Sequence, residues 1–180
     1  MDRQPTLEGE SLQLRPLAAD DWQGLFAVAS DPDVWALHPV NTRWQEPVFR
    51  AFFDEALREG GALVAVDKAS GAICGSSQYR GHDAAASQVE IGWTFLGRDH
   101  WGGETNREMK WLMLSHALAS VGRVVFRVGE TNLRSRRAME KIGGVLTRET
   151  DTIQGPNGPI KHVVYEITRD GFSAGPLMRG

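Results

Sequence analysis

The stretch that decides the fold runs from residue 88 to residue 106 and reads Gln88-Val89-Glu90-Ile91-Gly92-Trp93-Thr94-Phe95-Leu96-Gly97-Arg98-Asp99-His100-Trp101-Gly102-Gly103-Glu104-Thr105-Asn106. Its first half alternates in polarity, which predicts a strand with the odd-numbered residues from Val89 to Phe95 on one face. Its second half is a loop rich in glycine and polar residues, and the helix-like stretch 107–120 follows. Such a turn aims backbone N–H groups and the positive end of a helix dipole at one spot. We therefore predict that this stretch holds a phosphate-bearing cofactor.

Working outward, hydrophobic periodicity and turn residues predict the element order β-α-α-β-β-β-α-β-α-β-β. The second to fourth strands form an antiparallel meander, and the helix at 107–120 crosses over between two parallel strands. The predicted fold class is thus α/β (α+β), a single mixed, mostly antiparallel sheet of about seven strands with helices on both faces. The strands are expected at 11–17, 62–67, 72–80, 88–95, 124–128, 145–152 and 160–168, and the helices at 20–30, 47–59, 107–120 and 132–143.

The long central helix is expected to open with a capping box, in which Thr105 and Glu108 each satisfy a backbone N–H group. Its apolar surface extends to Trp111, which predicts a well-buried helix. The chain as a whole is expected to form one domain over residues 11–170. Residues 1–10 are expected to be a flexible N-terminus, and residues 171–180 a loose C-terminal tail.

Composition limits the classes of function. The chain has 180 residues, a formal net charge of -3 and a pI of about 6.0, which argues mildly against nucleic acid as the main partner. Its one cysteine, Cys74, forms no intramolecular disulfide, which favours a reducing compartment. No apolar run reaches ~18 residues, so no membrane partner is expected, and the cytoplasm is the expected location. The five histidines show no metal-ligand spacing, so no metal is expected.

Three segments, at residues 12–21, 89–103 and 132–143, resemble the GCN5-related N-acetyltransferases (GNAT). The likeness is to the ribosomal-protein N-terminal acetyltransferases, the RimJ/RimL-like branch. The resemblance implies acetyl-CoA as donor and a primary amine as acceptor, either a protein N-terminal α-amine or a small-molecule amine. It also implies that the two parallel strands splay apart to hold the pantetheine arm. A homodimer is compatible with the sequence, which does not define the oligomeric state.

The family pattern also implies a set of coenzyme-binding residues. The pyrophosphate would lie on the backbone amides of the loop at 101–107, and Asn132 would line the opposite wall. The set comprises Trp93, Thr94, Phe95, Leu96, Trp101, Gly102, Gly103, Glu104, Thr105, Asn106, Arg107 and Asn132.

Two positions depart from the family pattern. Glu104 stands where the phosphate loop usually has a second glycine, and Met139 aligns with the tyrosine that many members use to protonate the leaving thiolate. A methionine side chain has no proton to donate. These departures motivate an alternative function, a non-catalytic acyl-CoA-binding module with the same fold.

Acetyl transfer needs a neutral amine and hydrogen-bond donors near the reacting carbonyl. Glu90 is the candidate general base, and the alternative is a strand glutamate paired with an arginine or lysine. Ser135 is the candidate acid or hydrogen-bond donor to the coenzyme, and the alternative is a local bond to the backbone. Trp35, His38 and Tyr79 are the expected acceptor-binding residues. The alternative for the aromatic segment around His38 is a hydrophobic cluster under a loop.

Overall fold

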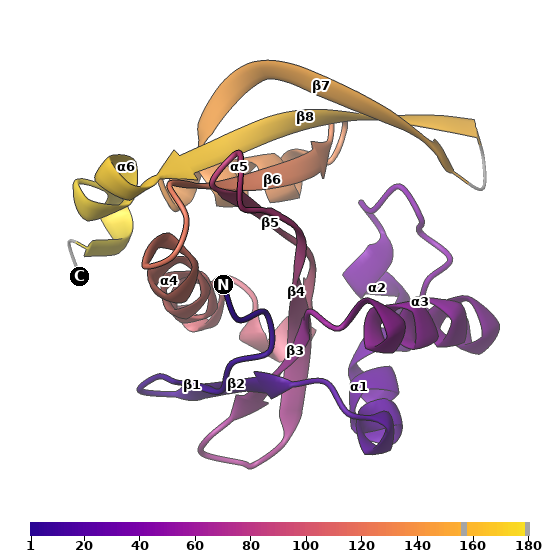
Figure 1. The fold of residues 1–180 in the computed structure, drawn as a ribbon. Helices are drawn as coiled ribbons and strands as arrows, with labels where there is room; N and C mark the ends of the chain where they lie inside the picture. Colours follow the sequence, from indigo (N-terminus) through magenta and orange to yellow (C-terminus); the bar gives the residue numbers. More distant parts are fainter. Residues whose placement is uncertain (156–157, 179–180) are drawn as a thin grey trace.

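A computed structural model describes residues 1–155 and 158–178 of the chain. Within these ranges the strands form one eight-stranded sheet in the order β1-β2-β3-β4-β5-β6-β8-β7 (Figure 1). The predicted fold class is confirmed, and the strand beyond the expected seven is the short β1 near the N-terminus. The strands are β1 (Leu7–Glu8), β2 (Leu12–Pro16), β3 (Ala62–Asp67), β4 (Ile73–Asp83), β5 (Gln88–Leu96), β6 (Arg123–Gly129), β7 (Val145–Gly155) and β8 (Gly158–Thr168).

Helices cover both faces of the sheet. In Figure 1, α4 lies on one side of β3 to β5, and α1 to α3 lie on the other. No described helix is both long enough and apolar enough to cross a membrane. The helices are α1 (Trp22–Ala29), α2 (Pro32–Trp35), α3 (Glu46–Glu59), α4 (Thr105–Leu118), α5 (Leu133–Lys141) and α6 (Arg169–Ser173), with short 3-10 turns η1 (Ala19–Asp21), η2 (Arg98–His100) and η3 (Pro176–Met178).

The parallel pair of strands is β5 and β6, joined by the crossover helix α4, as predicted. They pair only from Gln88↔Arg123 to Glu90↔Val125, and the pairing stops there. Beyond that point β5 continues beside β4 alone, while β6 continues beside β8. The two strands therefore diverge in the middle of the sheet.

A bulge in β5 changes the predicted strand pattern. Ser76 pairs with Phe95, whereas Gln78 pairs with Gly92, so β5 contains one residue more than β4 over this interval. Trp93 lies at this bulge and has a left-handed φ of 53°. An extra residue reverses which face the following side chains use. Val89 and Ile91 pack in the core beneath α4, but Phe95 packs with α1 and α3, so the prediction of one shared face is wrong.

The start of α4 also differs from the prediction. Glu104 is the N-cap residue, and no side chain caps the helix there. Glu108 instead accepts a hydrogen bond from the backbone N–H of Ser11 (2.9 Å) and another from the Ser11 hydroxyl. The capping-box prediction is wrong because this glutamate joins α4 to the segment that precedes β2. Trp111 is 39% exposed, so the buried face of α4 is rotated away from it.

Described residues near both chain ends contact the rest of the domain. At the N-terminus, Leu7 pairs with Leu14, and Arg3 donates to the Glu59 carbonyl at 3.2 Å. Near the C-terminus, Phe172 in α6 and Leu177 in η3 are buried in the α4-side core. The predicted turn at 154–159 is shorter than expected because β7 reaches Gly155 and β8 starts at Gly158, and residues 156–157 lie outside the described ranges.

If the C-terminal segment is part of the core, Phe172→Ala should lower the free energy of unfolding by about 3 kcal/mol, because it leaves a cavity. Met178, which is 50% exposed, provides the control, and Met178→Ala should change stability by less than about 0.5 kcal/mol. Urea unfolding followed by circular dichroism measures both values. Equal small effects would show that the C-terminal segment does not stabilise the domain.

Candidate active site

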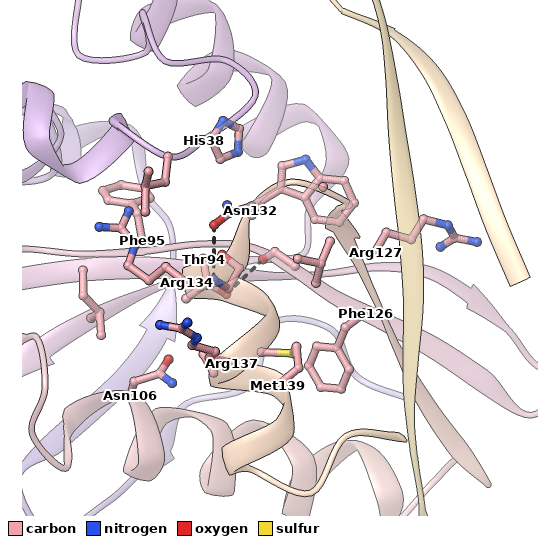
Figure 2. A pocket seen from close by; sticks show the side chains of 18 of the residues that line it. His38, Thr94, Phe95, Asn106, Phe126, Arg127, Asn132, Arg134, Arg137 and Met139 are labelled. Atoms are coloured by element: carbon pink, nitrogen blue, oxygen red, sulfur yellow. Dashed lines mark hydrogen bonds between the residues drawn. The ribbon is translucent and has the colours of Figure 1, made fainter. Parts of the chain in front are cut away.

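A cavity with a volume of about 1290 Å³ lies where β5 and β6 diverge. Figure 2 shows its side chains converging from β5, β6, the segment after α2, the start of α4 and helix α5. Residues from the β7–β8 hairpin close one end. The structure thus brings most of the predicted site residues, which are far apart in sequence, to one cavity.

One end of the cavity is the glycine-rich loop and the N-terminus of α4. Gly102 has a left-handed φ of 72°, and a Cβ atom built on Gly103 would meet no atom within 4 Å. Arg107 and Arg137 line this end beside Asn106. Backbone amides at a helix start, open space and two guanidinium groups together fit a phosphate. The predicted residues that line the cavity here are Trp101, Gly102, Gly103, Glu104, Asn106 and Arg107.

Two of the expected loop residues behave differently from their neighbours. The Glu104 side chain is 85% exposed, and its Oε2 lies 3.4 Å from Arg107 Nε, so its carboxylate turns toward an arginine and does not cap α4. Thr105 does not line the cavity, and its Oγ1 lies 3.4 Å from His100 Nδ1. The glutamate that replaces a family glycine therefore lies at the cavity edge with its carboxylate beside Arg107.

The middle of the cavity lies between β5 and helix α5. Trp93, Thr94, Phe95 and Leu96 line it from β5, and Met139 lines it from α5. These β5 residues follow the last pair that β5 makes with β6, so they face the gap between the strands. An elongated ligand in this gap would lie along the backbone of β5.

Asn132 and Ser135 form the opposite wall. Asn132 is buried, and its Oδ1 accepts a hydrogen bond from the Ser135 N–H at 3.2 Å, which caps α5 (Figure 2). The Ser135 hydroxyl and the Asn132 side-chain nitrogen have no hydrogen-bond partner within residues 1–155 and 158–178. The local backbone bond considered for the Ser135 side chain is therefore not made, and both groups remain available to a ligand in the cavity.

Glu90 is 8% exposed and forms a short ion pair with Arg127 Nη1. Arg127 Nε also lies 3.5 Å from Asp151 Oδ2. Burial raises the pKa of Glu90, although Arg127 acts in the opposite direction. The pairing with an arginine is confirmed, and Glu90 lines the cavity at the same time. A buried carboxylate with a raised pKa is a better proton acceptor than an ordinary glutamate.

Lys110 is a cavity residue that sequence reasoning missed. It is 2% exposed, and its Nζ donates to Thr94 Oγ1 at 2.6 Å and to Ser77 Oγ at 3.2 Å. No carboxylate within the described residues pairs with it, and burial lowers its pKa to about 7. The signal was present in the sequence, because Lys110, Met113, Leu114 and Ala117 have the i, i+3, i+4, i+7 spacing of one helix face.

The other end of the cavity contains Trp35 and His38. Trp35 packs in an aromatic cluster with Phe49, Phe52 and Phe95, as the hydrophobic alternative predicted, and it also reaches the cavity wall. His38 lines the cavity, and burial lowers its pKa to about 3, so the ring is neutral.

Tyr79 lies outside this site. Its side chain is fully buried beneath α4, and its hydroxyl donates to the Met113 carbonyl at 2.7 Å. It is absent from the cavity lining, so the expectation that it binds the acceptor is wrong. The reason is the register of β4, which turns this ring toward α4. No group of three or more His, Cys, Asp or Glu residues in the described ranges is arranged to hold a metal ion.

A family model described as the acetyltransferase (GNAT) domain matches residues 11–145. The chain therefore belongs to the GNAT acetyltransferases and is an acyltransferase. No curated protein sequence matches the chain.

Solved structures show the same fold. A protein from T. thermophilus assigned as an acetyltransferase is 28% identical, with a TM-score of 0.75 over 94% of this chain and 92% of that one. A Vibrio cholerae protein assigned as a ribosomal-protein-serine acetyltransferase is 12% identical, with a TM-score of 0.71 over 93% and 99%. A spermidine N-acetyltransferase from Vibrio cholerae, solved with CoA and spermine, is 13% identical, with a TM-score of 0.68 over 91% and 99%.

The Lys110 environment predicts a pH-dependent stability. The amine titrates near 10.5 in the unfolded chain and near 7 in the folded one, so between these values the unfolded state holds the proton more readily. Stability therefore rises as pH increases from 7 to 10.5, and the burial penalty is complete below pH 7. Lys110→Met should raise the free energy of unfolding at pH 7 by on the order of a few kcal/mol and flatten this dependence.

The control for this measurement is Lys141→Met, which alters an exposed lysine on α5 and should change neither quantity. Urea unfolding at pH 6, 7.5 and 9 gives the comparison. A Lys110→Met variant with the wild-type pH dependence would mean that the folded protein keeps Lys110 charged.

Proposed function

We propose that the chain transfers the acetyl group of acetyl-CoA to a primary amine by direct attack. The observation that carries this proposal is the continuous cavity between β5 and β6. It joins the phosphate-fitting start of α4 to an end where a buried glutamate with a raised pKa lies. A donor entering at one end and an amine entering at the other would meet beside β5.

The residues present fit coenzyme A. The backbone amides of residues 102–107 and the side chains of Arg107 and Arg137 would hold the pyrophosphate. Asn132 and Ser135, with unused polar groups, would bind the pantetheine arm. Bound acetyl-CoA would supply an acetyl thioester. The Vibrio cholerae spermidine N-acetyltransferase, which shares this fold, has been solved with CoA, and that likeness supports the assignment.

Glu90 would accept the proton that the amine loses, directly or through a water molecule. Its burial keeps the pKa above the ordinary value, and Arg127 fixes the orientation of the carboxylate. The Ser135 hydroxyl would donate a hydrogen bond to the leaving sulfur. Much of the rate would come from positioning the two substrates in one cavity.

The acceptor is either a protein N-terminal α-amine or a small-molecule amine. Named structural neighbours include both kinds, a ribosomal-protein-serine acetyltransferase assignment and a spermidine N-acetyltransferase. The cytoplasm, where acetyl-CoA is available to such an enzyme, is the proposed location. The overall experiment is incubation with acetyl-CoA and a panel of amines and N-terminal peptides, with free thiol as the readout.

The second candidate function is a non-catalytic acyl-CoA-binding module. Met139 favours it, because methionine stands at the cavity wall where many family members have the proton-donating tyrosine. Glu104, an acidic residue beside Arg107 at the phosphate end, is the other reason for it. Tight coenzyme binding without thiol release on any acceptor would favour the module, and absence of coenzyme binding would exclude both functions.

Asn132→Ala should weaken coenzyme A binding by roughly 10-fold, because it removes one hydrogen-bonding group from the wall and the cap of α5. Thr168→Ala is the matched control, since Thr168 caps α6 in the same way by accepting from the Gly171 N–H at 3.1 Å, outside the cavity. Isothermal titration calorimetry gives the dissociation constants. Equal affinities in the two variants would remove Asn132 from the coenzyme site.

Glu90→Gln should lower kcat roughly 100-fold at neutral pH and less at pH 9 to 10, where more of the amine is already neutral. Glu130→Gln, which alters the exposed partner of Lys161, should leave the pH profile unchanged. Steady-state rates across pH 6 to 10 test this. A loss of the same size at every pH would assign Glu90 a structural role as the partner of Arg127.

A further inference from the structure

The acceptor end of the cavity contains a cation without a counterion. Arg43, in the segment between α2 and α3, lines the cavity with its guanidinium carbon 4.5 Å from the Phe52 ring centroid and 5.3 Å from that of Trp35. No carboxylate in the described part of the chain lies within ion-pair distance of it. Glu55, the carboxylate that acts on it electrostatically, pairs with Arg80 at 2.7 Å. Aromatic packing therefore holds a charged group beside the cavity with its charge unmatched.

His38 adds a second donor at the same place. Its Nδ1 accepts a hydrogen bond from the Val40 N–H at 2.9 Å, so Nδ1 carries no proton. Because the ring is neutral, the proton lies on Nε2. That Nε2 is 3.3 Å from Arg43 Nη1, which is also a donor. Two donors do not bond to each other, so both need an acceptor atom from the cavity.

A second charged cluster also lines the cavity. Glu90 and Asp151 contribute two carboxylates and Arg127 one guanidinium, so this cluster has one negative charge in excess. All three line the cavity. His162, also in the lining, has a buried Nδ1 without a partner in the described residues. Near His38, Arg134 also lines the cavity and acts electrostatically on the His38 ring, so the cations at this end are Arg43 and Arg134, while Glu90 and Asp151 supply carboxylates elsewhere in the lining.

This arrangement lies apart from the phosphate end. In Figure 2, His38 lies at the opposite side of the pocket from Asn106 and Arg137. A group bound by His38 and Arg43 would thus belong to the acceptor and not to the pyrophosphate. The fork of the Arg43 guanidinium matches the two oxygens of a carboxylate.

We propose that Arg43 and His38 form a carboxylate subsite, and that the acceptor is a small amine that also carries a carboxylate, as an amino acid does. The amine lies toward Glu90 and Asp151, and the carboxylate accepts hydrogen bonds from Arg43 and His38 Nε2. The inference rests on the proposed acetyl transfer. A polyamine lacks the group that this subsite binds, and Arg43 disfavours a second ammonium there.

The test uses acceptors in matched pairs, each an amino acid and its carboxamide, such as L-phenylalanine with L-phenylalaninamide and β-alanine with β-alaninamide. Peptides with an acidic second residue and spermidine complete the panel. With the wild-type enzyme, kcat/KM for the acid of a pair should exceed that for the amide by roughly 10- to 100-fold. Arg43→Met should remove this preference by lowering the rate with the acid and leaving the rate with the amide within a factor of about three.

Arg50→Met is the matched control, because the Arg50 guanidinium also stacks on an aromatic ring, 3.1 Å from the Trp22 centroid, but lies outside the cavity. It should keep the acid preference. His38→Gln, which retains a side-chain N–H donor, should keep more of the preference than His38→Leu. Unchanged coenzyme A affinity in Arg43→Met shows that the fold and the donor site are intact.

The outcomes separate the two proposals. Two results would overturn the carboxylate subsite without contradicting acetyl transfer. One is transfer to amides or spermidine at least as fast as to acids, and the other is an acid preference that persists in Arg43→Met. A preference for acidic peptides over free amino acids would overturn the small-acceptor assignment. If no amine is acetylated, calorimetric binding of the same acid and amide pairs to the coenzyme A complex still decides the subsite, because an equal affinity for acid and amide contradicts it.

Discussion

The bulge at Trp93 is the constraint on which the site depends. A left-handed tryptophan costs about 1–2 kcal/mol, so surrounding contacts must hold it in place. Arg80 stacks on its ring at 4.0 Å and is itself paired with Glu55, while Lys110 supports the next residue, Thr94, from below. With the bulge in place, β5 follows β4 and separates from β6 after Glu90. The gap that results is the cavity, which most of the candidate residues line.

The charged groups along this cavity are arranged unevenly. Basic groups and backbone amides gather at the start of α4, a buried lysine lies beneath the middle, and a glutamate whose pKa is raised by burial lies at the far end. Glu90 illustrates that a structural role and a chemical role are compatible, because its partner Arg127 orients the carboxylate while burial keeps the pKa high. The same is true of Asn132, whose oxygen caps α5 and whose nitrogen remains without a partner among the described residues.

Local sequence signals predicted much of this structure. Helix α3, with its four buried apolar residues and left-handed Gly60 at its end, follows from periodicity and capping, as does β3 with its tight turn. The failures have long-range causes. Glu108 bonds to Ser11, and the bulge depends on pairing between β4 and β5. In the site, the loop and Asn132, which the resemblance implied, line the cavity. Helical spacing marks Lys110 as a residue of the buried face of α4, whereas Arg43 required the structure, because no motif marks a lone cation in a loop as a cavity residue.

Binding of coenzyme A in the gap created by the bulge is tested most directly by NMR. The measurement is the change in backbone amide shifts of the isotopically labelled protein on titration with coenzyme A. We predict that the largest changes fall on residues 94–96, 102–107 and 132–135, from both sides of the gap. Changes concentrated around Gly9, Glu10 and Trp111, which line the smaller hollow of about 500 Å³, with none at residues 94–96, would contradict this binding mode.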